Sequence, residues 1–122
     1  MDNLNTATDL IPAARQEGDS IILSVRGELD LHNSPELRTH LLDLLNRTKP
    51  RRLVLNLGGV PYMDSSALAV LVEALKKMMK TGGRVFLVAL QPRVKGLIEI
   101  ARLATIFGIC ASEQDALAEK IP

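Results

Sequence analysis

The apolar residues of this chain occur in two kinds of run. Short, almost continuous aliphatic runs are typical of buried strands, and longer stretches with apolar residues three or four positions apart are typical of amphipathic helices. The short runs cover 20–26, 53–57, 84–89 and 106–110, and helical stretches begin near Ser34, Ser65, Pro92 and Glu113. The chain is therefore predicted to alternate strands with helices.

The first residues depart from this alternation. Residues 1–8 are mostly polar, and we expect a flexible tail there, followed by one folded domain over 9–122. Two runs, at 9–16 and 20–26, flank a short turn and predict an antiparallel hairpin. Pro12 places the first of these strands at an edge of the sheet, because proline has no N–H to donate to a neighbouring strand.

The order of these elements predicts the fold class. A strand, a helix and a following strand join through a right-handed crossover, which makes the two strands parallel. We therefore expect an α/β fold, a single domain with a mostly parallel sheet, an N-terminal antiparallel edge hairpin and about four helices. The 122 residues can bury one core, and because 47% are apolar but only 2% aromatic, that core is aliphatic.

The predicted helix over 65–80 has two different faces. On a wheel of about 100° per residue, its apolar face carries Leu68, Leu71, Leu75 and Met78. The opposite face is charged toward its C-terminus, but near its start it carries only Ser66, Ala69 and Val70. Such a small, uncharged surface is explained either by a covering loop or by a docking surface for another protein.

Polar residues follow two of the predicted strands. Asp30 comes after the strand over 20–26, and Asp64 and Ser65 come after the strand over 53–57. The carboxyl ends of parallel strands gather at one edge of a sheet, which is the usual place for function. We therefore expect these three residues to lie close together.

The residues at this edge lack the pattern of an enzyme. No G-x-S-x-G, phosphate-binding loop, dinucleotide fingerprint or metal-ligand spacing is present. His32 is more typical of a surface loop than of a catalyst, and the only cysteine, Cys110, is typical of a small buried residue. A receiver domain would end its central strand in an acid, where this chain has Asn56-Leu57-Gly58. We therefore predict no catalytic residue, no cofactor and no metal site.

The charge balance argues against nucleic acid and membrane partners. Lys plus Arg total 15 and Asp plus Glu total 14, so the net charge is only +1. The basic cluster over 47–52 lacks the interleaved aromatic residues that stack on bases. No apolar run approaches the ~20 residues of a membrane span, and no basic n-region precedes an apolar stretch at the N-terminus. We therefore expect a cytoplasmic protein without direct nucleic-acid contact or membrane insertion.

Ser65 and Ser66 at the start of the predicted helix suit a phosphate. A helix N-terminus offers free N–H groups and the positive end of a dipole, worth ~0.3–1 kcal/mol to an anion. A phosphate adds about −1.5 to −2 charges to an edge that already holds Asp30 and Asp64, and like charge facing a partner costs several kcal/mol. The fold should therefore tolerate a phosphate that a docked partner would not, and this argument does not choose between the two serines.

Three motifs together resemble one known family. They read G-E-L-D (27–30), L-V-L-N-L (53–57) and V-P-Y-M-D-S-S (60–66), and the last is the most specific. With the sequence around them, from about Ser20 to Ala118, they are similar to the STAS-domain anti-sigma factor antagonists of bacteria. A STAS-like domain is the α/β fold already expected from the pattern.

This resemblance implies a non-enzymatic protein that works by partner switching. In that family an unmodified antagonist binds an anti-sigma factor that is also a serine kinase, and so frees the sigma factor. The kinase phosphorylates the serine directly after the Asp, here Ser65, which abolishes binding until a phosphatase restores it. A second copy of the chain is a further candidate partner. With the helix wheel, the resemblance implies partner-binding residues Asp30, Asp64, Ser65, Ser66, Ala69 and Val70.

Two alanines depart from the family pattern. The family commonly reads D-S-S-G-L-G, and here Ala67 and Ala69 stand at the glycine positions. Each exchange favours a helix by ~1 kcal/mol but adds a methyl group where a partner approaches. STAS domains also occur in stress-signalling scaffolds and as subunits of membrane transporters for lipids or anions. The alternative is therefore a constitutive binding subunit in which Ser65 only caps a helix.

Overall fold

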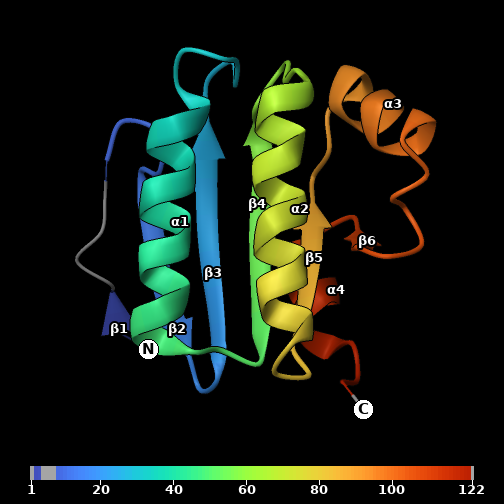
Figure 1. The fold of residues 1–122 in the computed structure, drawn as a ribbon. Coiled ribbons are helices and arrows are strands. Elements are labelled where there is room, and N and C mark those ends of the chain that lie inside the picture. The colour runs from blue at the N-terminus through green and yellow to red at the C-terminus, as the bar shows by residue number, and fades with distance from the viewer. Residues whose placement is uncertain (1, 4–7, 122) are drawn as a thin grey trace.

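The computed structural model describes residues 2–3 and 8–121. A six-stranded sheet runs through the molecule, in the order β1-β2-β3-β4-β5-β6 (Figure 1). The strands are β1 (Asp2–Asn3), β2 (Ala13–Glu17), β3 (Ser20–Arg26), β4 (Arg52–Gly59), β5 (Arg84–Val88) and β6 (Gly108–Cys110). The helices are α1 (Ser34–Thr48), α2 (Ser65–Met79), α3 (Pro92–Ile100) and α4 (Glu113–Ala118). The predicted alternation of strands and helices is confirmed.

The sheet is mixed in the way the element order predicted. Strands β1, β2 and β3 pair antiparallel, whereas β3, β4, β5 and β6 are parallel neighbours. A helix connects each pair of parallel neighbours, as right-handed crossovers require. The predicted α/β fold with an antiparallel N-terminal edge is therefore confirmed.

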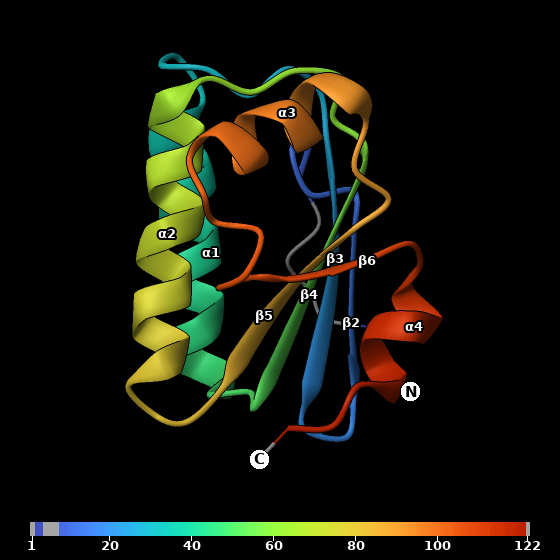
Figure 2. The same cartoon turned by 90° about the vertical axis from the view of Figure 1, so that its right-hand side faces the viewer.

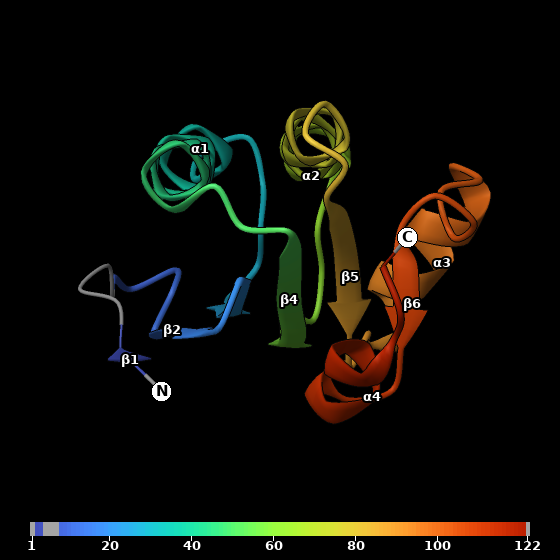
Figure 3. The ribbon, with the colours of Figure 1, turned by 90° about the horizontal axis from the view of Figure 1, so that it is seen from below.

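Helices cover both faces of the sheet. Helices α1 and α2 lie side by side on one face, and α4 lies against β4, β5 and β6 on the other (Figure 3). Helix α3 lies near one end of α2 (Figure 2) and contributes Val94 and Ile98 to the main aliphatic core. The predicted apolar face of α2 is buried in the same core, through Leu68, Leu71, Leu75 and Met78.

The N-terminal hairpin is shorter than the sequence predicted. Strand β2 begins at Ala13 rather than Asp9, since Pro12 cannot donate to β3. Leu10 is nevertheless buried, and its carbonyl accepts a hydrogen bond from the N–H of Arg26 at 3.0 Å. The chain ahead of β2 therefore covers the core without extending the ladder.

The expected tail over 1–8 is described only in part. Asp2 and Asn3 form β1 and pair with Gln16 and Arg15 of β2, which the polar composition of this segment did not predict. Residues 1 and 4–7 lie outside the described residues.

Strand β4 also extends beyond its predicted end. The sequence predicted a loop from Gly58, but β4 continues through Gly59. The Gly27 N–H donates to the Gly59 carbonyl at 2.9 Å, so the end of β4 stays attached to the chain leaving β3. The loops after these two strands therefore start side by side.

Candidate functional site

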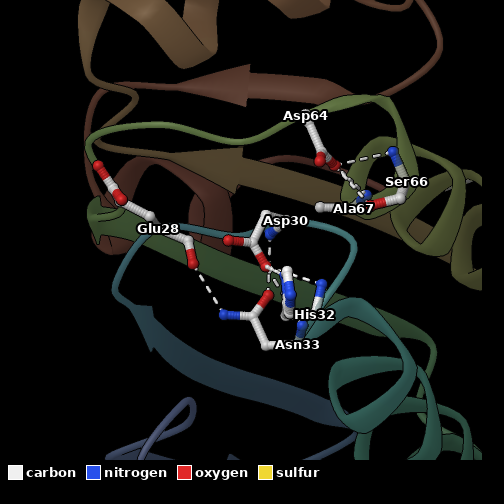
Figure 4. A network of polar contacts seen from close by, with 7 residues as sticks. All are labelled: Glu28, Asp30, His32, Asn33, Asp64, Ser66 and Ala67. Carbon is white, nitrogen blue, oxygen red and sulfur yellow. Dashed lines mark hydrogen bonds and ion pairs between the residues drawn. The ribbon is translucent and has the colours of Figure 1, made fainter.

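Backbone hydrogen bonds join the loops that follow β3 and β4. The Leu29 N–H donates to the Tyr62 carbonyl, and the Asp64 N–H donates to the Leu29 carbonyl, each at 3.0 Å. Leu29 and Met63 form an isolated parallel bridge, and both side chains are buried. Asp30 and Asp64 each follow a residue of this bridge, so both acids lie at the carboxyl edge of the sheet (Figure 4).

Asp30 closes the turn that leads into α1. Its Oδ1 accepts hydrogen bonds from the backbone N–H groups of His32 at 2.9 Å and Asn33 at 3.3 Å. The side chain of Asn33 makes two further hydrogen bonds in this turn. Its Oδ1 accepts from the Asp30 N–H at 2.9 Å, and its Nδ2 donates to the Glu28 carbonyl at 2.8 Å (Figure 4). Asn33 therefore fixes the loop rather than capping α1 with its side chain. The side chain of His32 is 94% exposed.

Asp64, not Ser65, is the N-cap of α2. Its Oδ1 accepts from the backbone N–H groups of Ser66 at 2.9 Å and Ala67 at 3.3 Å, and from the Ser66 hydroxyl (Figure 4). The hydrogen bond from the Ser66 hydroxyl holds the pKa of Asp64 below its usual range. Partial desolvation opposes this shift, and the hydrogen bonds from the helix N–H groups add to it. The acid is therefore charged at neutral pH and satisfies the free donors of the first turn.

The two serines have different environments. Ser66 is half-buried and its hydroxyl is bound to Asp64. Ser65 is exposed, and within residues 2–3 and 8–121 no protein group hydrogen-bonds to its hydroxyl. The helix wheel placed Ser66 on the outward face, but Ser66 is only half-exposed, because its hydroxyl turns toward Asp64. Ser65 is thus the hydroxyl that another protein can reach.

A shallow groove of about 430 Å³ extends from Ser65 along α2. Its wall is formed by Ser65, Leu68, Ala69, Val72, Glu73 and Lys76. The Arg38 guanidinium of α1 binds one of these residues, Glu73, through two hydrogen bonds of 2.7 Å. These hydrogen bonds hold the pKa of Glu73 below its usual range. Ser65 therefore stands at one end of a groove that also contains Glu73, which is held in an ion pair with Arg38.

Two residues assigned to this surface from the sequence are buried. Val70 is only 6% exposed and belongs to the main core, so its placement on the outward face was wrong. Ala67 is fully buried, so its methyl group packs inside the domain rather than toward a partner. Ala69 is exposed beside the groove. Of the two departures from the family glycines, only Ala69 meets the surface.

Some features of this edge were missed by sequence reasoning. The Arg38–Glu73 pair joins residues 35 positions apart, and only the spacing of Ser65, Ala69 and Glu73 by four residues could have indicated one shared helix face. Leu31, 71% exposed beside Asp30, had no signal at all.

Neither metal binding nor thiol chemistry is indicated by the geometry. In the described part of the chain, no three His, Cys, Asp or Glu side chains converge as metal ligands would. Burial, together with the nearby Glu119 and Asp115, raises the pKa of the Cys110 thiol and makes it a poorer nucleophile. A membrane-crossing helix, which must be long and apolar, is not found among the described residues.

Comparisons with known proteins place the whole arrangement in context. The STAS domain model matches residues 11–116. The anti-sigma-B factor antagonist of Bacillus subtilis is 33% identical over 82% of this chain and 90% of its own length. The crystal structure of an anti-sigma factor antagonist from Mycobacterium paratuberculosis has a TM-score of 0.78 and 27% identity, covering 91% of this chain and 94% of that one.

Two further similarities bear on function. YvdB of Bacillus subtilis, which is provisionally named a sulfate transporter, is 30% identical over 77% of this chain. The matched region is 18% of YvdB. The cell fate determinant SpoIIAA of Bacillus, in its phosphorylated form, has a TM-score of 0.68 at 18% identity, covering 85% of this chain and 94% of that one, and so shares the fold.

Proposed function

This chain belongs to the STAS domain family, and from that premise we propose that it is an anti-sigma factor antagonist controlled by phosphorylation of Ser65. Its unmodified form binds an anti-sigma factor that is also a serine kinase. Phosphorylation of Ser65 ends this binding, and a phosphatase restores it. The protein itself carries out no chemical step in this cycle. Relatives that match most of this chain are named anti-sigma factor antagonists, which supports the general role.

The single observation that carries this proposal is the contrast between the two serines. Ser65 is exposed and its hydroxyl has no hydrogen-bond partner among the described residues, whereas the Ser66 hydroxyl is bound to the Asp64 cap. A kinase must reach and align its acceptor oxygen, and only Ser65 offers one without breaking a contact that holds α2. The structure of phosphorylated SpoIIAA, which has the same fold, is consistent with a phosphate being accommodated by this fold.

A phosphate on Ser65 would act on binding more than on folding. Ser65 is the first residue of α2, where the helix dipole favours an anion by ~0.3–1 kcal/mol. A partner docked over Asp30, Asp64 and the Ser65 groove would meet about −1.5 to −2 additional charges at its surface. Like charges in such a contact cost several kcal/mol. The modification therefore separates the partners while leaving the domain folded.

The proposal is tested by labelling with the kinase partner. Wild-type protein, Ser65→Ala and Ser66→Ala are incubated with the cognate kinase and ATP, and the products are mapped by mass spectrometry. We expect one phosphoryl group on wild type and on Ser66→Ala, at Ser65, and none on Ser65→Ala. Labelling of Ser65→Ala to the extent of wild type would show that the site is elsewhere.

A second candidate function is a constitutive binding subunit of a transporter or scaffold. The similarity to part of the sulfate transporter YvdB favours it. In that case Ser65 is never modified, and the protein co-purifies with a membrane or assembly component from its native cell. Phosphorylation of Ser65 there, together with recovery of a soluble kinase, would exclude this candidate.

A further inference from the structure

The ends of α1 and α2 that lie away from Ser65 form a second surface feature. A groove of about 250 Å³ opens where both helices end, at the end of the molecule seen in Figure 3. Its floor is apolar and buried, and is made by Leu45, Pro50 and Met78. The groove is smaller than the about 300–1,000 Å³ typical of small-molecule sites, which suits a single inserted side chain.

Three lysines surround this apolar floor. Lys49, Lys77 and Lys80 line the groove, and none of its described lining residues is acidic. Lysines at helix C-termini also complement the helix dipole, but the dipole requires no apolar hollow between them. An apolar floor within a basic rim is complementary to a ligand with one apolar group and flanking negative charges.

The backbone at Lys49 positions one side chain of this rim. Lys49 caps α1 in the left-handed conformation, with φ 46°, and its N–H donates to the Leu45 carbonyl at 2.9 Å. Glycine adopts this conformation without strain and is the usual residue there. Ala89 and Arg102 adopt the same conformation, so the backbone does not by itself assign a role to Lys49, but it does fix where the Lys49 side chain starts beside the groove.

The charge around the groove extends beyond its rim. Residues 47–52 carry four basic side chains and residues 76–84 carry four more, and neither segment contains an acid. The acids Glu28, Asp30 and Asp64 lie in the loops at the opposite edge. Two acids near the C-termini of α1 and α2 offset part of this charge: Asp43 pairs with Arg47 at 3.0 Å, and Asp19 lies where its carbonyl accepts from the Arg51 N–H. Basic residues nevertheless outnumber acids at this end of the molecule.

We propose that this groove binds an acidic segment of a partner protein, with one apolar side chain on the floor and carboxylates on the lysines. A lipid surface fits less well, because the apolar surface is concave and none of the large exposed apolar residues lines it. Nucleic acid fits less well, because no aromatic side chain among the lining residues can stack on a base.

This second surface is independent of the switch at Ser65. Helix α2 has 15 residues, so its two ends are about 22 Å apart. That distance exceeds the ~8 Å Debye length at physiological ionic strength, so the charge of a phosphate at Ser65 is largely screened there. The protein can therefore hold an acidic partner in both states of the switch, which goes beyond the function proposed above.

The test uses a synthetic peptide with one phenylalanine flanked on each side by glutamates. Amide chemical shifts of the full chain are followed by NMR as peptide is added. We expect shifts in 45–50 and 77–81, a several-fold weaker effect when alanine replaces the phenylalanine, and equal binding to the Ser65→Asp variant. Absence of shifts in these segments would overturn the proposal, as would stronger response to phosphatidylglycerol vesicles or to single-stranded DNA than to the peptide.

Matched variants separate the groove from general basic charge. Lys77→Gln/Lys80→Gln should bind the peptide about three- to tenfold more weakly, whereas Lys95→Gln/Arg102→Gln, on and after α3, should bind it as wild type does. Asn46→Trp leaves every lysine in place but fills the groove, and should also weaken binding. Equal loss in both double variants, or full binding by Asn46→Trp, would mean nonspecific attraction and would contradict the proposal.

Discussion

At the start of α2, three consecutive side chains have three separate tasks. The Asp64 carboxylate caps the helix, the Ser66 hydroxyl supports that carboxylate, and the Ser65 hydroxyl remains accessible. The charged Asp64 carboxylate therefore lies beside Ser65, the proposed phosphorylation site, because it is needed to cap the helix. This arrangement lets Ser65 change its chemistry without loss of the contacts that start the helix.

Replacing Asp64 by alanine should destabilise the domain in a pH-dependent way. The pKa of Asp64 lies below the 3.8 of the free side chain, chiefly through the Ser66 hydroxyl. Its charged form therefore stabilises the fold above that pH, and the effect is lost as the pH falls through the lower folded-state pKa. Urea unfolding should show Asp64→Ala less stable than wild type at pH 7, with the difference shrinking in acid below pH ~4. A constant difference across this range would contradict the capping role.

Neighbouring positions on α2 should respond differently to an introduced charge. Ala69 is exposed beside the Ser65 groove, so Ala69→Asp should weaken binding to the kinase partner and leave unfolding nearly unchanged. Val70 is buried, so Val70→Asp should lower the free energy of unfolding by roughly 2 kcal/mol or more. Calorimetry of folding and of binding distinguishes the two effects. Equal stability of both variants would contradict the packing described for α2.

Among the elements, α4 is held on the sheet by both polar and apolar contacts. Glu113 at its start pairs with Arg15 of β2 at 2.9 Å and accepts from Asn56 of β4 at 2.8 Å. Arg52 donates to the Ala116 carbonyl near the middle of the helix. Beneath α4, a small apolar cluster contains Ile22, Val54, Phe86, Val88 and Ala116. The helix is therefore tied to two strands, β2 and β4, through the Glu113 carboxylate and the Arg52 guanidinium.

Loss of the Glu113 carboxylate should loosen α4. Glu113→Ala leaves the half-buried Asn56 and Arg15 without this partner, and we expect a loss of about 1–3 kcal/mol in the free energy of unfolding. Amide exchange in 113–118 should become faster. Gln114→Ala, an exposed position on the same helix, is the control and should change neither quantity. Slow exchange retained in Glu113→Ala would show that the apolar cluster alone holds the helix.

The elements themselves were largely predictable from sequence, while their side-chain contacts were not. The apolar face of α2 follows from a periodicity that any helix of 15 residues imposes. The burial of Val70 does not follow from this periodicity. Helix α2 lies between α1 and α3 (Figure 3), so a wider part of its surface is buried than one apolar stripe. The side chain of Asn33, just before α1, bonds Asp30 and Glu28 instead of the first turn of the helix, in a loop whose path depends on the neighbouring strand. Local patterns thus predict elements, and tertiary neighbours decide how their ends are used.

Over the whole molecule, the two parallel helices α1 and α2 present opposite chemistry at their two ends. The N-terminal end carries the acids Glu28, Asp30 and Asp64 and the accessible Ser65, and the C-terminal end carries the basic groove. A charge change at one end is distant from the other, and the aliphatic core between them is continuous. The domain is therefore suited to lose one partner without unfolding and without loss of the second surface.

The switch at Ser65 is tested most sharply by comparing the unmodified protein with protein phosphorylated at Ser65. Affinity for the kinase partner is measured by calorimetry, and the thermal midpoint of each form is measured alongside. We predict that phosphorylation weakens binding by at least about a hundredfold, since like charge at such a contact costs several kcal/mol, and that the thermal midpoint changes little. Equal affinity of the two forms, or unfolding of the phosphorylated form, would contradict a switch at Ser65.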